Sequence, residues 1–269
     1  MSKIYEALQK AQEEREGTAA AAAPRFEQPR RRSWWRLQGS GRAMTGRRSK
    51  GGLKIDFDLA PDIEEAYQRL GTNLLMPAKE RPALRDLMVV AALHGEGTTT
   101  TAALFASTLA KRKKLDVLLI ECNFRTPALE QVFPIDRDGG FADLIEGRRE
   151  ADGLVQKTPQ EHLFVMTSGH YETSPTGVLE SPRLPEVLEK LHERFQFVVF
   201  DSAPVNVYTD ALILGPRLDA AVFVIEADRT RIEEVQRAKR HLERAGANML
   251  GVLLNRRKDY LPPFLAGLI

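Results

Sequence analysis

A turn rich in glycine and hydroxyl residues follows an apolar segment at residues 87–93. Gly95 and Gly97 let successive backbone N–H groups curl around an anion, and the start of a following helix adds partial positive charge. This arrangement predicts a phosphate-binding turn between a strand and a helix, although a strand-to-helix turn without a ligand is the alternative. The residues of the predicted site here are Gly95, Glu96, Gly97, Thr98, Thr99 and Thr100.

The segments around this turn predict the fold that positions it. From residue 55 onward, short continuous apolar runs alternate with amphipathic stretches of helical period. Such runs, separated by helices, are typical of a mostly parallel, doubly wound α/β sheet that is covered on both faces. In open sheets of this kind the ligand lies at the carboxyl ends of the strands. The apolar runs are 87–93, 116–122, 162–168, 195–202, 220–227 and 249–256, and the helices include 62–76, 99–112, 184–194 and 231–245.

A basic segment precedes the α/β region. Residues 24–50 carry nine arginine and lysine residues against the single acid Glu27, a net charge of +8, and both tryptophans, Trp34 and Trp35. Few aliphatic residues accompany them, so the segment cannot bury a core and is predicted to be disordered. Indole rings and basic side chains favour an anionic membrane surface. A solvated linker and, least favoured, a nucleic-acid contact are the alternatives.

The first sixteen residues predict a short amphipathic helix. Ile4, Leu8 and Ala11 share one face, but a helix of this length is marginal alone. It is either a helix that docks on a partner or a frayed terminus. The predicted organisation is therefore a helix at 1–16, a disordered basic linker at 17–54 and a P-loop NTPase-like α/β domain at 55–269.

Composition excludes several other classes of protein. One cysteine, Cys122, rules out a disulfide scaffold, and the five dispersed histidines have no metal-ligand spacing. The sequence shows no apolar run of transmembrane length and no secretory signal at its start. We expect a cytoplasmic protein that is at most peripheral at the inner membrane.

Several motifs between residues 63 and 255 resemble the CpsD/CapB-type bacterial tyrosine kinases, which are similar to the ParA/MinD-like deviant Walker ATPases. The phosphate turn is one such motif. The segment Ile120-Glu-Cys-Asn-Phe-Arg-Thr-Pro127 is similar to the family's second carboxylate motif, and Asp201-Ser-Ala-Pro204 to its Walker B motif. The opening residues 1–11 resemble family members found with exopolysaccharide and exosortase systems.

The resemblance implies ATP and Mg²⁺ as cofactors. It places Thr99 and Asp201 at the magnesium-ligand positions, Asn255 at the position that reads adenine, and Asp201 with Glu121 as catalytic carboxylates. It also implies an inner-membrane chain-length (co-polymerase) protein as the partner.

Departures from the family pattern matter as much as the matches. Thr98 stands where the family has the loop lysine, and Glu121 and Asn123 replace two aspartates. Losing positive and negative groups that position phosphates predicts a catalytically inactive protein. Gln68 and Gly71 replace two arginines of an interface motif, so we expect no family-type ring oligomer.

Three functions remain open at this point. The first is a regulatory or scaffolding component of exopolysaccharide synthesis and export that lacks kinase activity. The second is an active ATP-dependent tyrosine autokinase in which Glu121 and Asp201 hold magnesium. The third is a ParA-like positioning ATPase that uses the basic segment on DNA. The sequence does not decide whether nucleotide binds, nor whether the chain is an enzyme.

Overall fold

A computed structural model describes residues 61–75 and 84–256 of the chain. The described residues all belong to the unit that spans 45–269, and residues 1–44 lie outside them. The predicted N-terminal helix, 1–16, and the whole of the predicted basic linker, 17–54, therefore lie outside the described residues. Within the described residues, no helix combines the length and the apolar character needed to cross a membrane.

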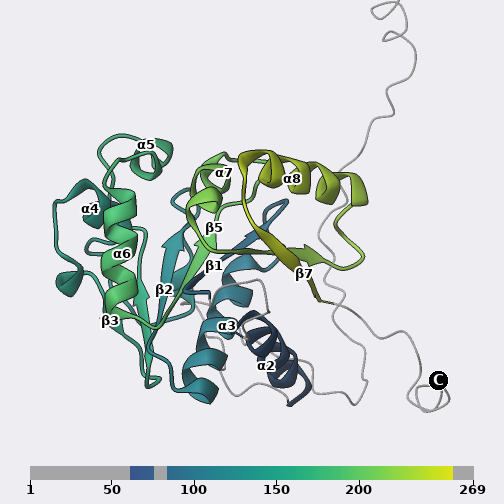
Figure 1. The fold of residues 1–269 in the computed structure, drawn as a ribbon, viewed down its shortest axis with the longest axis horizontal. Helices are drawn as coiled ribbons and strands as arrows, with labels where there is room; N and C mark the ends of the chain where they lie inside the picture. Colours follow the sequence, from purple (N-terminus) through teal and green to yellow (C-terminus); the bar gives the residue numbers. More distant parts are fainter. Residues whose placement is uncertain (1–60, 76–83, 257–269) are drawn as a thin grey trace, which may run out of the picture. The chain divides into compact units, whose positions relative to one another are not determined.

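Seven strands form one sheet in the order β3-β4-β2-β5-β1-β6-β7 (Figure 1). All neighbouring pairs are parallel except β3 and β4, which are antiparallel. This confirms the predicted mostly parallel α/β fold. The strands are β1 (Asp86–Ala91), β2 (Val117–Cys122), β3 (Gln156–Lys157), β4 (Leu163–Met166), β5 (Phe197–Ser202), β6 (Ala221–Glu226) and β7 (Met249–Asn255).

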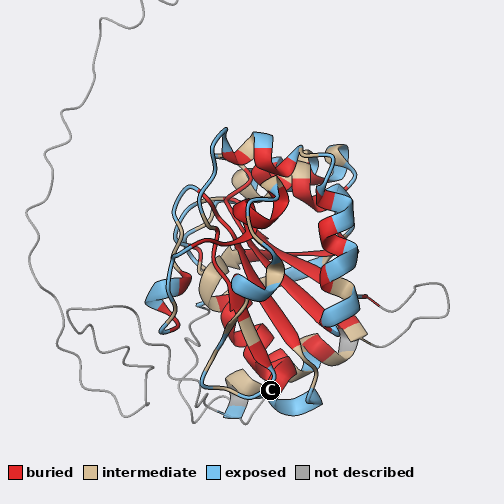
Figure 2. Cartoon of the chain, turned by 90° about the vertical axis from the view of Figure 1, so that its left-hand side faces the viewer, coloured by how far each residue is buried: buried red, intermediate tan, exposed pale blue. Residues whose placement is uncertain are grey.

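Helices cover both faces of the sheet, which explains why the central strands are continuously apolar. In β1, Met88 and Val90 face one hydrophobic core while Leu87 and Val89 face the other. Figure 2 shows both buried layers on either side of the strands. One face packs against α2 (Pro61–Leu75) and α3 (Thr98–Lys113); the other packs against α4 (Phe141–Glu146), α5 (Pro175–Leu179), α6 (Leu184–Arg194), α7 (Asp210–Leu214) and α8 (Ile232–Ala245).

Gly71 allows a close approach between α2 and α3. A Cβ atom at this position would lie 2.8 Å from Cδ2 of Leu109 and 3.7 Å from the ring of Phe105. The glycine that replaces a family arginine is therefore buried in the helix contact, and an arginine there would have to displace α2 from α3.

Three short helices and the edge strand β3 are absent from the sequence-based prediction. The elements α4, α5 and α7 span five or six residues each, which is too short for a helical period to show. Several strands are also shorter than predicted. The strand predicted at 162–168, for example, is β4, which begins at Leu163 and ends at Met166.

Candidate phosphate-binding site

The turn between β1 and α3 has the backbone geometry of an anion cradle. Gly95 and Gly97 have φ angles of +83° and +93°, a region that favours glycine. The α3 helix then begins, with the Thr101 N–H donating to the Gly97 carbonyl at 2.9 Å. A Cβ atom on Gly97 would lie 2.2 Å from Nδ2 of Asn255, so no larger residue fits there. The first turn of α3 thus presents free backbone N–H groups toward the sheet edge.

Glu96 stabilises the turn from behind. Its buried carboxylate accepts a hydrogen bond from the Leu93 N–H at 2.7 Å and another from the Thr230 hydroxyl. Its carbonyl oxygen accepts a bond from Nδ2 of Asn255 at 2.8 Å. Glu96 and Asn255, both predicted as cofactor-binding residues, therefore meet at the turn, but the Glu96 carboxylate faces the protein interior.

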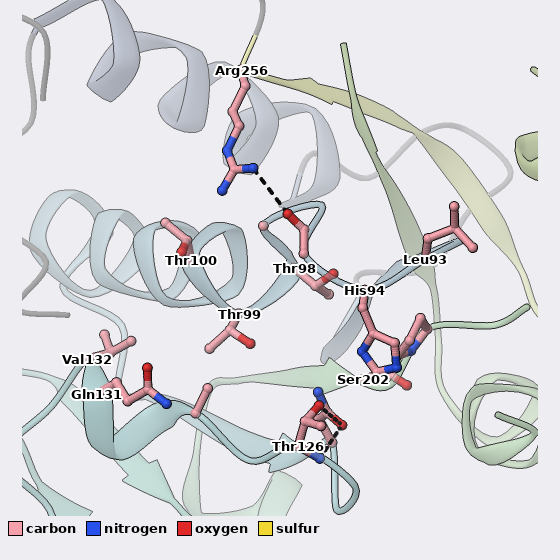
Figure 3. A pocket seen from close by; sticks show the side chains of 15 residues that line it. Leu93, His94, Thr98, Thr99, Thr100, Thr126, Gln131, Val132, Ser202 and Arg256 are labelled. Atoms are coloured by element: carbon pink, nitrogen blue, oxygen red, sulfur yellow. Dashed lines mark hydrogen bonds between the residues drawn. The ribbon is translucent and has the colours of Figure 1, made fainter. Parts of the chain in front are cut away.

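A cavity of about 270 Å³ opens in front of the turn. Figure 3 shows the hydroxyl residues at the start of α3 facing the loops that follow β2 and β5. The predicted residues Gly95, Gly97, Thr98, Thr99 and Thr100 thus come together with parts of both loops. The residues from elsewhere in the chain that line the cavity are Leu93, His94, Asn123, Thr126, Ala128, Gln131, Val132, Ser202, Pro204 and Arg256.

Asp201 lies near the end of β5, next to Ser202, which lines the cavity; Asp201 itself is completely buried and, like Glu121, is not among the lining residues. Within the described residues, neither of its carboxylate oxygens nor the Ser202 hydroxyl has a partner at hydrogen-bonding geometry. Burial raises the pKa of Asp201 to about 8; the nearby Thr99 hydroxyl lowers the pKa in part, and the Glu121 carboxylate raises it further. The buried carboxyl group therefore lacks a compensating charge.

These oxygen groups fit Mg²⁺. The ion prefers oxygen ligands and is commonly held by one or two protein groups together with substrate phosphates and waters. Asp201 and Thr99 would supply the protein ligands. Among the described residues there is no group of three or more histidine, cysteine, aspartate or glutamate side chains suited to a metal, so the fit depends on a bound phosphate.

The loop after β2 uses its polar residues differently. Glu121 is buried and accepts hydrogen bonds from the backbone N–H groups of Leu129 at 2.8 Å, Ser168 at 3.2 Å and Ala128. Asn123 accepts bonds from both the N–H and the hydroxyl of Thr126, each at 3.2 Å. The structure thus places Glu121 as an anchor for the loop and does not place it among the residues that line the cavity.

Two arginines that the sequence analysis missed lie over the phosphate-binding turn. Arg256 donates from Nη1 to the Gly95 carbonyl at 3.2 Å (Figure 3). The same Nη1 donates to Glu226 at 2.9 Å. Arg229 donates to the other oxygen of Glu226 at 2.6 Å. Only the position of Arg256 in the sequence could have indicated its role. It directly follows a predicted strand, and the carboxyl ends of parallel strands lie at the edge of the sheet where ligands bind.

An aromatic cluster adjoins His94, one of the residues that line the cavity. Arg125 pairs with the buried Asp210 at 3.3 Å and lies 5.0 Å above the ring of Tyr208. Tyr208 contacts His94 edge-on, with the ring centroids 5.5 Å apart. His94 is exposed and lines the cavity.

Comparisons with known proteins give a consistent picture. No protein-family model matches the chain. The chain is 30% identical over 194 residues to tyrosine-protein kinase YwqD of Bacillus subtilis, which covers 72% of this chain and 81% of that protein. It is also 30% identical over 204 residues to tyrosine-protein kinase CpsD of Streptococcus pneumoniae, covering 76% and 87% respectively.

Solved structures of similar fold point the same way. The chimerical protein CapA2B2 superposes with a TM-score of 0.69 at 26% identity, covering 74% of this chain and 87% of that one. The VpsO kinase domain gives a TM-score of 0.65 at 29% identity, covering 73% and 95%. The septum site-determining protein MinD of Pyrococcus horikoshii, solved with Mg-ADP, gives 0.54 at 21% identity and 68% and 75% coverage, which shows a shared fold alone.

Proposed function

The chain belongs to the CpsD/CapB-type family of bacterial tyrosine kinases, and on that premise we propose that it is a nucleotide-binding regulatory or scaffolding component of exopolysaccharide synthesis and export. It binds ATP with Mg²⁺ and transfers phosphate slowly or not at all. The observation that carries this proposal is an intact phosphate-binding turn whose neighbouring transfer groups have been replaced.

The proposed nucleotide binding rests on the turn and on two side chains beside it, the half-buried Thr99 and the buried Asp201. Gly95 and Gly97 free the backbone N–H groups for phosphate, and Thr99 with Asp201 would hold Mg²⁺. When bound, the ion neutralises phosphate charge. A cation near Asp201 also stabilises the ionised carboxylate, which is otherwise disfavoured by burial at neutral pH.

The proposed loss of phosphoryl transfer rests on two replacements. Thr98 cannot neutralise the charge that develops on a transferring phosphate, and Asn123 has no charge with which to position a metal or an attacking hydroxyl. Phosphoryl transfer depends almost entirely on such positioning and neutralisation. Each group contributes about 3–4 kcal/mol in comparable sites, so losing two lowers the rate by several orders of magnitude.

The partner we propose is an inner-membrane chain-length (co-polymerase) protein, as the family resemblance implies. Residues 24–50, with their charge of +8 and both tryptophans, would add contact with the anionic surface of that membrane. Deleting residues 24–50 should then abolish binding to anionic vesicles. Equal binding of the full and shortened chains would show that the segment only spaces the N-terminal residues from the domain.

The kinase question is tested with the purified full chain and Mg-ATP. We expect a fluorescent ATP analogue to bind and to be displaced by ATP, with no phosphotyrosine formed during prolonged incubation. Phosphotyrosine on the wild-type chain would instead support an active autokinase. Absence of nucleotide binding would overturn the proposal itself.

A further inference from the structure

We propose that Arg256, from the end of β7, is the cation that binds the terminal phosphates of the nucleotide, in place of a lysine in the phosphate-binding turn. The inference rests on the nucleotide binding proposed above and assigns one residue to it. It predicts that the turn retains useful affinity although Thr98 is uncharged.

The position of the guanidinium group is the first argument. Arg256 lines the cavity, and its Nη1 lies 3.2 Å from the Gly95 carbonyl oxygen within the turn itself. Arginine stays charged at all physiological pH values, and its planar fork matches phosphate oxygens. A phosphate held by the turn would thus lie within reach of a fixed positive charge that comes from another strand.

The backbone at the end of β7 directs the side chain back toward the turn. Arg256 has a φ angle of +56°, an uncommon conformation for a residue that is not glycine. Asn255 stabilises it, because its side-chain oxygen accepts the Arg256 N–H at 2.9 Å while its Nδ2 donates to the Glu96 carbonyl at 2.8 Å. Such a conformation, held by contacts with the turn, is typical of functional positions.

Among the described residues, the Glu226 carboxylate accepts hydrogen bonds from both Arg256 and Arg229. Burial raises the pKa of Glu226, but hydrogen bonds from Arg256 and Arg229 outweigh burial and lower the pKa overall. The ionised Glu226 carboxylate therefore accepts hydrogen bonds from two guanidinium groups at once. A phosphate could replace the Gly95 carbonyl as an acceptor for Arg256 while the bond to Glu226 persists.

Neighbouring arginines are less suited to this role. Arg229 lies 3.5 Å from the Gly95 carbonyl and is not among the residues that line the cavity. Arg125 is paired with Asp210 and stacked on Tyr208. We therefore expect a graded effect, large at Arg256 and small at Arg229.

The first test uses calorimetric titration of the full chain with inorganic tripolyphosphate and with Mg-ATP. Arg256→Gln should weaken both affinities by about tenfold, and Arg229→Gln by no more than about threefold. Arg194→Gln is the matched control, since Arg194 ends α6 and pairs with Asp152, away from the cavity. Equal affinities of wild type and Arg256→Gln would overturn the inference, as would a loss confined to ATP, which would indicate contact with the base or ribose.

A rescue experiment provides the second test. If Arg256 replaces the missing loop cation, Thr98→Lys in the Arg256→Gln background should restore tripolyphosphate binding to near the wild-type value. No recovery in a folded double variant would contradict the exchange of roles. A wild-type chain that binds neither ligand would refute the proposed nucleotide binding, whereas binding that is insensitive to Arg256→Gln would refute this inference alone.

Discussion

Two neighbouring parts of the same sheet edge use their polar residues in opposite ways. At the β1–β5 side, Asp201 and the Ser202 hydroxyl are buried without hydrogen-bond partners among the described residues. At the β2 side, Glu121 accepts three backbone hydrogen bonds and Asn123 accepts two. The first part holds polar atoms that an external ligand could satisfy. At the second part, the Glu121 carboxylate and Oδ1 of Asn123 already accept hydrogen bonds from the protein, although Asn123 also lines the cavity.

This difference agrees with the proposal that the chain retains nucleotide binding and has lost phosphoryl transfer. Unpartnered buried polar groups are costly, so they persist where a ligand or metal completes them. Polar groups that are fully bonded to the local backbone contribute to stability instead. Each prediction below perturbs one part and leaves the other as its comparison.

The largest effect should come from Glu121→Ala. The variant leaves two buried N–H groups and one partly buried N–H group without an acceptor, and each unsatisfied group costs about 1–3 kcal/mol. We expect the free energy of unfolding, measured by urea denaturation, to fall by about 4 kcal/mol. Ser202→Ala is the comparison on the other part and should change stability by less than about 0.5 kcal/mol, because its hydroxyl has no bond to lose. Similar losses in both variants would remove the distinction between the two parts.

Asp201→Asn should give the next largest effect, and it should depend on pH. The pKa of Asp201 is about 8 in the folded chain and 3.8 as its ordinary value. The folded state therefore binds more protons between these values, and wild-type stability from this group declines as pH rises from 4 to 8. The variant lacks that decline.

Thermal unfolding between pH 4.5 and 9 measures this difference. We expect Asp201→Asn to exceed the wild type by roughly 2–4 kcal/mol at pH 8.5, with the gain shrinking toward pH 4.5. Saturating Mg-ATP should raise the stability of the wild type and have less effect on the variant. Parallel pH profiles for the two proteins would show that Asp201 is not a high-pKa group.

Substitutions in α2 should have a smaller effect, since α2 supports the phosphate-binding side only from behind α3. Gly71→Arg restores a family residue but forces a side chain against Leu109, 2.8 Å from the position of a Cβ atom. We expect a loss of about 2 kcal/mol in the free energy of unfolding. Gln68→Arg, at a half-buried position, should be tolerated.

Light scattering should detect no ring oligomer in the wild type. A stable ring would contradict the role assigned to Gln68 and Gly71.

Restoring charge to the site should produce the smallest free-energy change. Thr98→Lys combined with Asn123→Asp adds a cation at the turn and an acid opposite it. We expect ATP affinity in the presence of Mg²⁺ to rise at least about tenfold, which corresponds to about 1.4 kcal/mol. A folded double variant without a gain would refute a decayed nucleotide site.

The parallel sheet and the phosphate-binding turn could be predicted from sequence because local features specify them. Continuous apolar runs indicate strands covered on both faces, and Gly95 with Gly97 marks a turn that needs positive φ angles. The short helices were missed because five or six residues carry no clear helical period. Strand ends were overestimated where apolar residues continue past the last pairing.

Functions that depend on distant segments could not be predicted. The groups that bind Glu121 come from residues 128, 129 and 168, and the path of two loops determines their approach. Arg256 meets Gly95 across 161 residues of sequence because β6 lies beside β1 and β7 lies beside β6. The sequence identifies the carboxyl edge but does not specify the order of its strands.

The most direct test of the central claim is calorimetric titration of the wild-type full chain with ATP, with and without Mg²⁺, followed by analysis of the same sample for phosphotyrosine. The account predicts saturable binding that is tighter with Mg²⁺ and leaves every tyrosine unmodified. Absence of binding under both conditions would contradict the retained phosphate-binding part. Binding accompanied by phosphotyrosine would contradict the loss of transfer chemistry at the β2 side.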